Sequence, residues 1–379
     1  MAKNLLIVES PAKAKTINKY LGKDFHVLAS YGHVRDLVPR EGAVDPDRDF
    51  AMRYELIDKN EKHVEAIAKA AKQADALYLA TDLDREGEAI SWHISEILRE
   101  RGLLDGRKLH RVVFSEITPK AINEAVAHPR KLQNDLVNAQ QARRALDYLV
   151  GFNLSPVLWR KVQTGLSAGR VQSPALRLIV EREEEIEAFK AQEYWTIAAQ
   201  CAHPSQAFDA RLLRYDGHKV EQFTFRDGEH AEAARAELIR AANGQLKVAD
   251  VTRKQRQRRP APPFITSTLQ QEAARKLGFG TSRTMRVAQG LYEGVALGAE
   301  GQVGLITYMR TDAVHLANDA IAELREVIAQ RYGKQALPDA PNTYKTKSKN
   351  AQEAHEAIRP TSALHTPESV AAFLNPDQL

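Results

Sequence analysis

The feature that most constrains the fold is an alternation of apolar segments with helical patterns from residue 3 to about residue 132. The apolar segments are short and rich in leucine, isoleucine and valine, which is typical of buried strands. Ser10 with Pro11, and Thr118 with Pro119, are typical of a helix cap followed by a first turn. This alternation predicts a parallel sheet with helices on both faces. We expect strands at 3–9, 76–81 and 111–117, and helices at 61–73 and 88–98.

Helical patterns replace the strands in the next part of the chain. Two long ones, at 134–150 and 173–189, flank a loop that carries glycine and serine, TGLSAGR at 164–170. Strand patterns return from Tyr194 to about Val251, with Asp216 and Gly217 marking a hairpin turn. The sequence therefore predicts a helical layer followed by a small mixed domain.

The last third contains an exposed linker and one more short strand. KQRQRRPAPP at 254–263 is charged and proline-rich, which predicts an exposed strap. Helical patterns then surround an expected strand, GLITYM at 304–309. The helical pattern at 367–374 runs into the final residues without a closing cap, so we expect a chain that is truncated.

Composition excludes several classes of protein. A chain of 379 residues with a 43% hydrophobic share can bury two to four cores. No run approaches the roughly 18 to 20 apolar residues of a membrane span, and the first segment is too short for a signal peptide. We expect no membrane partner and a cytoplasmic location. Cys201 is the only cysteine, so neither a disulfide framework nor a cysteine-rich zinc site can form within the chain.

Basic residues cluster locally although the net charge of +5 is modest. Clusters of this kind suit a polyanion, while a solvated surface explains any single cluster equally well. The clusters are Lys13 with Lys15 and Lys19, Arg143 with Arg144, and the run at 253–259.

Four acidic residues follow two of the expected strands. Asp82, Asp84 and Glu86 come directly after the strand at 76–81, and in an extended chain alternate side chains face the same way. Glu9 ends the other strand, and open parallel sheets place their sites beyond the carboxyl ends of strands. Four converging carboxylates predict a site for a hard cation such as Mg²⁺. The alternative is an acidic loop at a helix start, where acids oppose the macrodipole.

Two of these segments carry a resemblance. VESPAKAKTI at 8–17 and TDLDREGEAI at 81–90 are similar to the toprim domain of type IA DNA topoisomerases, and the acidic pattern also occurs in related primases, nucleases and type II topoisomerases. The resemblance implies that Glu9 takes part in catalysis and that Lys13 contacts the scissile phosphate. An exposed helix lysine is the alternative for Lys13.

A third segment, GLITYMRTD at 304–312, resembles the strand that carries the active-site tyrosine of the same family, which makes Tyr308 the expected nucleophile. A phenol with a pKa near 10 is ionised in about one molecule in a thousand at neutral pH, a deficit of roughly 4 kcal/mol. Arg310 would share a strand face with Tyr308 and grip a phosphate. AQEAHEAIRP at 351–360 resembles a further family segment, and implies that His355 acts near the nucleophile; Asp312 resembles a family acid.

NAQQARRALD at 138–147 and GLSAGRVQS at 165–173 resemble the segments with which the family holds single-stranded DNA. Arginine and amide groups can hold phosphates and bases, and a loop with glycine lets backbone amides approach an anion. A solvent-facing helix is the alternative. Where some relatives have arginine and tyrosine, this chain has Tyr148 and Phe152, which would alter the base-contacting pocket. The expected DNA-binding residues are His33, Arg143, Arg144, Asp147, Tyr148, Arg160, Ser167, Ala168, Gly169, Arg170, Val171, Gln172 and Arg310.

The resemblance implies a multidomain α/β plus α+β fold that forms part of a toroid. Its parts would be a Rossmann-like toprim domain at 1–132, a helical DNA-binding domain at 133–190, a β-rich arch at 191–260 and a tyrosine domain at 261–379. It also implies a nucleoid-associated monomer that relaxes negatively supercoiled DNA through a 5′-phosphotyrosine and needs Mg²⁺. No GxxxxGK[ST] loop is present, so we expect no nucleotide cofactor. The rival interpretations are a toprim nuclease or primase and a binding module for single-stranded DNA.

Overall fold

The computed structural model describes residues 3–203, 206–345 and 356–379. By their contacts these residues form two compact units, Met1–Gly169 with Pro260–Leu379, and Arg170–Arg259. Each unit is described by itself. The division into four domains is finer than this and stays a prediction.

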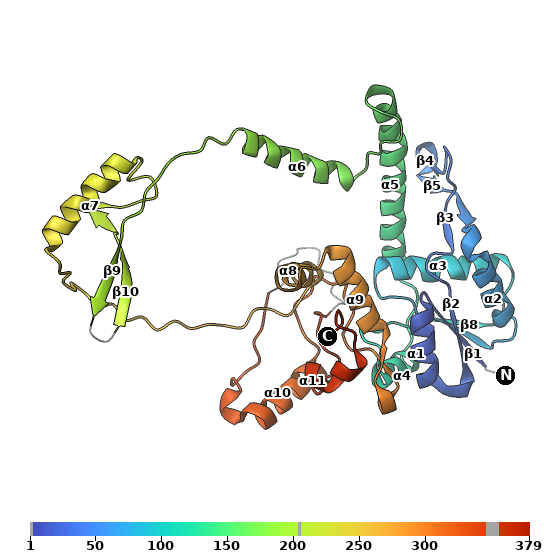
Figure 1. The fold of residues 1–379 in the computed structure, drawn as a ribbon. Coiled ribbons are helices and arrows are strands. Elements are labelled where there is room, and N and C mark those ends of the chain that lie inside the picture. The colour runs from blue at the N-terminus through green and yellow to red at the C-terminus, as the bar shows by residue number, and fades with distance from the viewer. Residues whose placement is uncertain (1–2, 204–205, 346–355) are drawn as a thin grey trace. The chain divides into compact units, whose positions relative to one another are not determined.

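The first unit is built on a four-stranded parallel sheet in the order β2-β1-β7-β8 (Figure 1). The central strand β1 pairs Leu6 with Val27 of β2 on one side and with Tyr78 of β7 on the other. The parallel sheet predicted from the alternating pattern is therefore confirmed. Its strands are β1 (Asn4–Val8), β2 (Phe25–Ala29), β7 (Ala76–Leu79) and β8 (Lys108–Arg111).

The strand expected at 111–117 is wrong for most of its length, because β8 ends at Arg111. The Val112 N–H still donates to the Leu79 carbonyl (2.9 Å), but β7 ends there and offers no further partner. The carbonyls of Ser115 and Ile117 instead accept hydrogen bonds from Tyr308 and Gly304. This segment therefore connects the sheet to residues 304–312, called the tyrosine segment below because they carry Tyr308.

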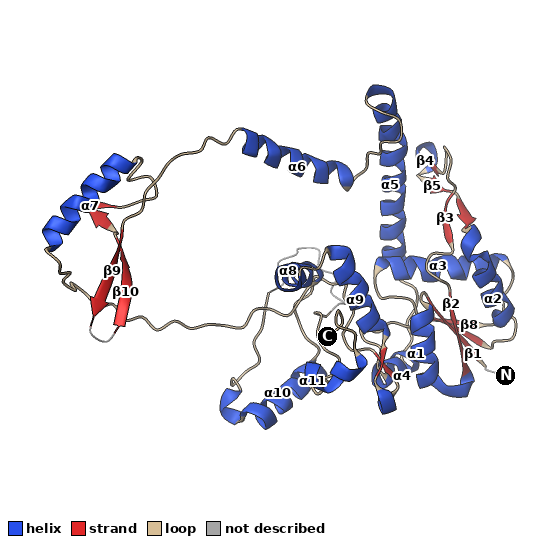
Figure 2. Cartoon of the chain, viewed as in Figure 1, coloured by secondary structure: helices blue, strands red, loops and turns tan. Residues whose placement is uncertain are grey.

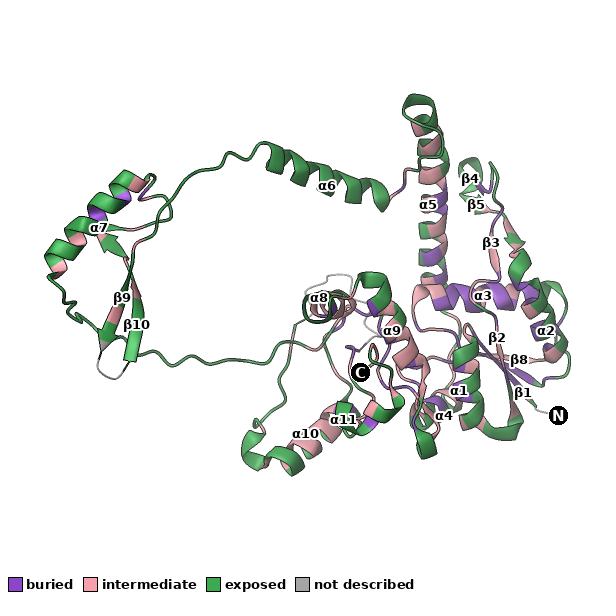
Figure 3. Ribbon diagram, in the orientation of Figure 1, coloured by how far each residue is buried: buried purple, intermediate pink, exposed green. Residues whose placement is uncertain are grey.

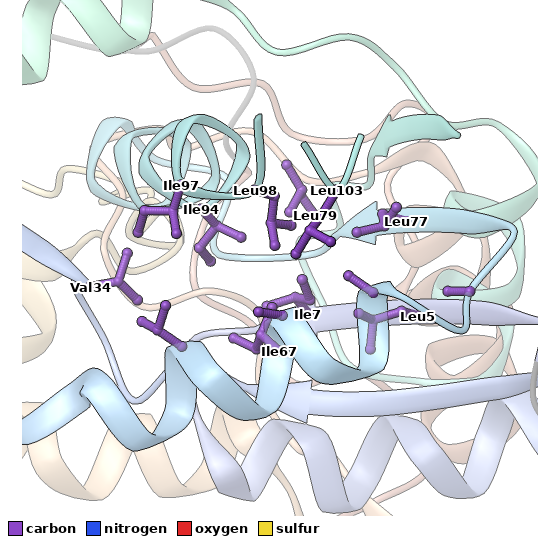
Figure 4. Close-up of a cluster of buried hydrophobic side chains, with 14 of the residues drawn as sticks. Leu5, Ile7, Val34, Ile67, Leu77, Leu79, Ile94, Ile97, Leu98 and Leu103 are labelled. Atoms are coloured by element: carbon purple, nitrogen blue, oxygen red, sulfur yellow. The ribbon is translucent and has the colours of Figure 1, made fainter. Parts of the chain in front are cut away.

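Helices cover both faces of the sheet, as expected. Leu5, Ile7, Leu77 and Leu79 pack with apolar residues of α2 and α3 on one face, and Figure 4 shows this cluster. Each such leucine or isoleucine stabilises the fold by about 1.5–3 kcal/mol when it is fully buried. The other face packs against α1, α4 and the tyrosine segment. These helices are α1 (Pro11–Leu21), α2 (Glu61–Ala71), α3 (Arg85–Glu100) and α4 (Pro119–Ala127).

The two predicted helix caps are confirmed. The Ser10 hydroxyl accepts a hydrogen bond from the Ala12 N–H at the start of α1 (3.2 Å). Thr118 caps α4 in the same way through the Ala121 N–H (3.2 Å). Each cap places a proline at the first turn, where its missing N–H costs nothing.

Short antiparallel pairs and further helices complete the first unit (Figure 2). The long helix predicted at 134–150 continues to Lys161, and its residues Ala145 and Tyr148 pack on the β3–β6 and β4–β5 region. The remaining elements are β3 (Arg35–Leu37), β4 (Val44–Asp45), β5 (Ala51–Met52), β6 (Tyr54–Leu56), α5 (Asn134–Lys161), α8 (Thr266–Leu277), α9 (Thr281–Glu293), β13 (Val295–Ala296), β14 (Gln302–Val303), α10 (Asn318–Tyr332) and α11 (Pro367–Val370).

The predicted strand at 304–309 is also wrong. β14 ends at Val303, and beyond it only Ile306 forms a bridge, with Pro360. Successive N–H groups reach different segments: Leu305 donates to Leu291, Thr307 to Arg359 and Tyr308 to Ser115. No single neighbour runs alongside long enough to form a ladder, although the segment is largely buried.

The second unit contains a long exposed helix and a small mixed fold. α6 (Gln172–Glu187) has no buried residue, as Figure 3 shows. The hairpin predicted at Asp216 and Gly217 is present between β11 and β12. Phe225 is buried at the centre of a small core. The other elements are β9 (Ala198–His203), β10 (Gln206–Arg211), β11 (Arg214–Tyr215), β12 (His218–Lys219) and α7 (Gly228–Ala242).

The predicted strap is confirmed as an exposed segment, since residues 251–260 have no helix or strand and are all exposed. Within the described ranges, no helix has the length and apolar character needed to cross a membrane.

Candidate active site

The acidic cluster begins where β7 ends, but its members do not lie on one extended strand. Asp84 is the N-cap of α3 and accepts a hydrogen bond from the Gly87 N–H through Oδ1 (2.9 Å). Glu86 therefore lies in the first turn of a helix. The prediction that these acids lie on one face of an extended chain is wrong beyond Asp84, because capping starts the helix at Arg85. The helix-start alternative is correct for this part of the cluster.

Lys13 is fully buried beside the first two acids. Its ammonium group forms ion pairs with Glu9 and Asp82. Burial alone would lower the pKa of Lys13, but Asp82 and Glu9 outweigh burial, so the pKa is raised and the lysine stays charged. Burial, followed by the charge of Glu9, raises the pKa of Asp82 to about 7. Lys13 is thus a central group of this site, and the exposed-lysine alternative is wrong.

Tyr308 reaches the same acidic cluster from the later segment of the first unit, Pro260–Leu379. Its hydroxyl donates to Asp84 Oδ2 at 2.7 Å. The side chain is only 3% exposed. Burial, and then the charges of Asp82 and Asp84, raises the pKa of Tyr308, whereas Arg310 lowers it. In this arrangement the phenol is protonated and held against a carboxylate.

A pocket of about 530 Å³ opens beside this hydrogen bond. Arg310 is exposed and lines the pocket together with Asp84, although the segment is not a strand. The pocket also contains Asp312, the family acid expected from the sequence. Its full lining is Asp84, Arg85, Glu86, Arg143, Ile265, Thr266, Ser267, Arg310, Thr311 and Asp312.

Comparisons with known proteins identify the family of this chain. The family profile described as DNA topoisomerase matches residues 131–374, and that of the toprim domain matches residues 4–117. The chain is 72% identical to DNA topoisomerase 1 of Xylella fastidiosa over 100% of its own length and 46% of that protein. It is 56% identical to DNA topoisomerase 1 of Rickettsia felis over 98% of its own length and 48% of that protein.

A solved structure matches as well. The match to full-length topoisomerase I from Thermotoga maritima covers 99% of this chain and 58% of the solved chain, with a TM-score of 0.78 and 40% identity. The chain belongs to the bacterial type IA DNA topoisomerase family. It spans about half the length of the curated relatives that it matches.

In this topoisomerase-family chain, Glu86 points to a different set of partners from the other three acids. Its Oε2 lies 3.5 Å from His33 Nε2 and accepts a hydrogen bond from Gln140 Nε2 (3.2 Å). His33 and burial act in opposite directions on the pKa of Glu86, and with the help of Gln140 the pKa is lowered.

The acids supply the oxygen donors that a hard cation prefers. Across residues 3–203, 206–345 and 356–379, no three His, Cys, Asp or Glu side chains are arranged to hold a metal ion. Glu9 and Asp82 both pair with the Lys13 ammonium group. Glu9 Oε2 is buried without a hydrogen-bond partner in the described chain. Since Mg²⁺ commonly takes one or two carboxylates and keeps several waters, this donor set suits that ion.

A buried ion-pair group missed in the sequence holds the acidic loop in place. Arg111 and Glu88 are both fully buried and joined at 2.9 Å, and Arg130 reaches the same carboxylate at 2.9 Å. The Arg111 guanidinium also donates to the backbone carbonyl of Thr81 (2.8 Å). In the sequence, the only sign of this group is a charged residue, Arg111, in a strand pattern. That pattern does not indicate that its partner is Glu88.

The expected DNA-binding residues on α5 are held by neighbouring groups. Arg144 pairs with Asp36 through two contacts of 2.7 and 2.9 Å, and Arg143 Nε lies 3.8 Å from Asp147. The hydroxyl of Tyr148 donates to the Arg40 carbonyl (2.5 Å), and its ring stacks on Phe152 at 4.2 Å. Tyr148 is therefore partly a packing residue.

The remaining candidates fall in three places. Arg160 and Ser167 are exposed in the first unit, where Ala168 N–H donates to Ser155 (3.3 Å) and Gly169 is buried. Residues 170–172, which are Arg170, Val171 and Gln172, begin the second unit and are described with it. His355 lies outside the described residues.

Proposed function

We propose that this chain forms the catalytic part of an ATP-independent type IA DNA topoisomerase, with Tyr308 as the nucleophile. The observation that carries the proposal is the 2.7 Å hydrogen bond from the Tyr308 hydroxyl to Asp84 Oδ2 at the acidic edge of the toprim sheet. It joins a nucleophile of the expected kind to a proton acceptor, which is the geometry required for covalent catalysis.

The proposed reaction exchanges one phosphoester for another. The Tyr308 oxygen attacks a backbone phosphorus, a Tyr–O–P bond forms, and the bond from phosphorus to the 3′ oxygen breaks. Asp84 Oδ2 is positioned to receive the phenolic proton, and the 3′ oxygen leaves as a hydroxyl after gaining a proton. Resealing is the reverse reaction. Because the two esters are similar in energy, nucleotide hydrolysis is not needed.

Cations next to Tyr308 would offset the cost of ionising the phenol. Arg310 lines the pocket and lowers the pKa of Tyr308. A guanidinium there can hold two phosphate oxygens at once. Lys13 would contact the scissile phosphate after exchanging one of its carboxylate partners. His355 and Asp312 are proposed to assist on the phosphate side.

Mg²⁺ is the proposed metal, with Glu9, Asp82, Asp84 and Glu86 as candidate ligands. When bound, it would neutralise the acidic edge and so favour the approach of a polyanion. Hard oxygen donors and the unpartnered Glu9 Oε2 support this assignment. Among the four acids, Glu86 would have to leave His33 and Gln140 to join a common site.

The proposed substrate is single-stranded or negatively supercoiled DNA, bound by a cytoplasmic, nucleoid-associated monomer. Underwound DNA exposes the single strand that the α5 residues and the loop at 165–173 would hold. Relaxation of supercoils by this chain is a separate proposal, since the chain spans about half of its relatives.

The direct test is a denaturing gel of the chain with a 3′-labelled single-stranded oligonucleotide. We expect a protein adduct at the 5′ side of the break that disappears in Tyr308→Phe. Cutting that survives in Tyr308→Phe would support the nuclease or primase alternative. Salt-sensitive binding without any adduct in the unsubstituted chain would support the binding-module alternative.

A further inference from the structure

We propose that Tyr292, a second tyrosine buried in the site, is a positioning residue that sets where the Lys13 ammonium and the Tyr308 ring lie. The inference rests on the proposed function of Tyr308. Tyr292 is neither the proposed nucleophile nor one of the proposed metal ligands.

Three contacts place Tyr292 between the other groups. Its ring meets the Tyr308 ring edge to face, with centroids 5.4 Å apart at 65°. The Lys13 ammonium lies over the Tyr292 ring, 4.8 Å from its centroid. Its hydroxyl is 3.4 Å from Asp82 Oδ1 and points to the carboxylate that Lys13 also binds. Tyr292 therefore touches the nucleophile, the buried cation and one acid.

The position of Tyr292 is fixed by its own element. It is fully buried in the last turn of α9. The Leu305 N–H donates to the Leu291 carbonyl (2.7 Å), which ties the end of α9 to the tyrosine segment. A Cβ on Gly304 would lie 2.6 Å from the Tyr292 carbonyl, so only glycine permits this approach. A shift of the Tyr292 ring would thus be transmitted to Tyr308.

The ring supplies more of this positioning than the hydroxyl does. An ammonium over an aromatic face and an edge-to-face aromatic pair are both favourable inside a protein. The hydroxyl contact of 3.4 Å is long for a hydrogen bond between oxygens. Burial, and then Asp82 and Glu9, raises the pKa of Tyr292 well above 10, so its hydroxyl stays protonated.

The test compares Tyr292→Leu, Tyr292→Met and Tyr292→Phe by their rate of adduct formation on saturating labelled single-stranded oligonucleotide. We expect the Leu and Met variants to be slower by at least about tenfold, the size of effect that the two ring contacts can produce. Tyr292→Phe should stay within about threefold of the unsubstituted chain, and the dissociation constant for the oligonucleotide should change less than about twofold in all three.

Tyr20→Leu is the matched control, because Tyr20 packs on the same face of the sheet and its hydroxyl donates to the Gln302 backbone carbonyl rather than to an acid of the site. Its adduct rate should not change. A second measurement repeats Tyr292→Leu in a Lys13→Met background, where we expect its effect to shrink since the cation is gone.

Each outcome decides the question. Adduct rates of Tyr292→Leu and Tyr292→Met that fall by less than about tenfold would overturn the inference and leave the proposed function intact. A Phe variant as slow as Leu would overturn it too, because the hydroxyl would then carry the effect. No adduct in the unsubstituted chain would end both proposals.

Discussion

The hydroxyl of Tyr308 donates to Asp84 Oδ2 across 224 positions of sequence. The other oxygen of the same carboxylate caps α3 through Gly87. One side chain therefore starts a toprim helix and holds the proposed nucleophile. Its structural and chemical contributions can be separated by substitution.

Asp84→Asn should keep the helix cap, because asparagine is as good an N-cap as aspartate. It removes the charged proton acceptor, so we expect the adduct rate to fall at least about tenfold with little loss of stability. Asp84→Ala should lose the cap as well, at a cost of about 1 kcal/mol. Urea unfolding and adduct assays on both variants measure the two effects. An unchanged adduct rate for Asp84→Asn would rule out Asp84 as the acceptor of the phenolic proton.

Glu88→Gln should destabilise the first unit by about 3 kcal/mol, since it leaves the Arg111 charge buried without its counterion. Both side chains are fully buried and lie 2.9 Å apart. Urea unfolding measures the loss. Glu232→Gln is the control, because its ion pair with Arg235 is exposed on α7 and should contribute nothing measurable. Equal stability of Glu88→Gln and the unsubstituted chain would contradict the prediction.

The same carboxylate predicts how stability depends on pH. Burial alone would raise the pKa of Glu88, but Arg111 and Arg130 outweigh burial and the pKa lies below its usual 4.5. Stabilisation by Glu88 is therefore present above pH 4.5 and is lost as the pH falls through the lower folded-state value. Urea unfolding between pH 7 and pH 3.5 should show a shallower decline for Glu88→Gln than for the unsubstituted chain. Parallel curves would refute this assignment.

Gly87→Ala should displace the acidic loop. A Cβ at this position would lie 2.1 Å from the Asp82 carbonyl oxygen, which is backbone and cannot rotate away. We expect lower thermal stability together with a strongly reduced adduct yield. Gly280→Ala is matched to it, because nothing lies within 4 Å of its added Cβ and its φ of −70° suits alanine. Equal thermal stability and equal adduct yield for the two variants would contradict the prediction.

The exposed strap should add affinity for the DNA backbone without sequence preference. Arg256, Arg258 and Arg259 are all exposed there. Changing the three to glutamine should reduce the slope of log affinity against log salt by up to about 2, since each single-strand phosphate contact contributes about 0.7.

The control for the strap replaces three arginines that already pair with neighbouring glutamates, which are Arg177, Arg182 and Arg235. Binding of a fluorescent single-stranded oligonucleotide at several salt concentrations gives both slopes. Equal slopes for the strap variant, the control and the unsubstituted chain would show that the strap does not contact DNA.

Much of the first unit could be predicted from local patterns. The strands at 3–9 and 76–81, and the caps at Ser10 and Thr118, depend on residues within a few positions of one another. The two segments wrongly predicted as strands, 111–117 and 304–309, are apolar. Their backbones are hydrogen-bonded to each other, with the carbonyls of Ser115 and Ile117 as acceptors. Apolar content indicates burial and does not reveal whether a neighbour runs alongside.

The sequence alone determined the sheet with its helices, the acids at the ends of β1 and β7, and the segment that carries Tyr308. Only the tertiary structure decided that Lys13 joins Glu9 to Asp82, that Glu86 turns to His33, and that the Tyr292 ring meets the Tyr308 ring edge to face. Periodicity and capping are interactions along one element, so they are written in neighbouring residues. Ion pairs and ring contacts between residues hundreds of positions apart depend on how the elements pack, and no short segment encodes that.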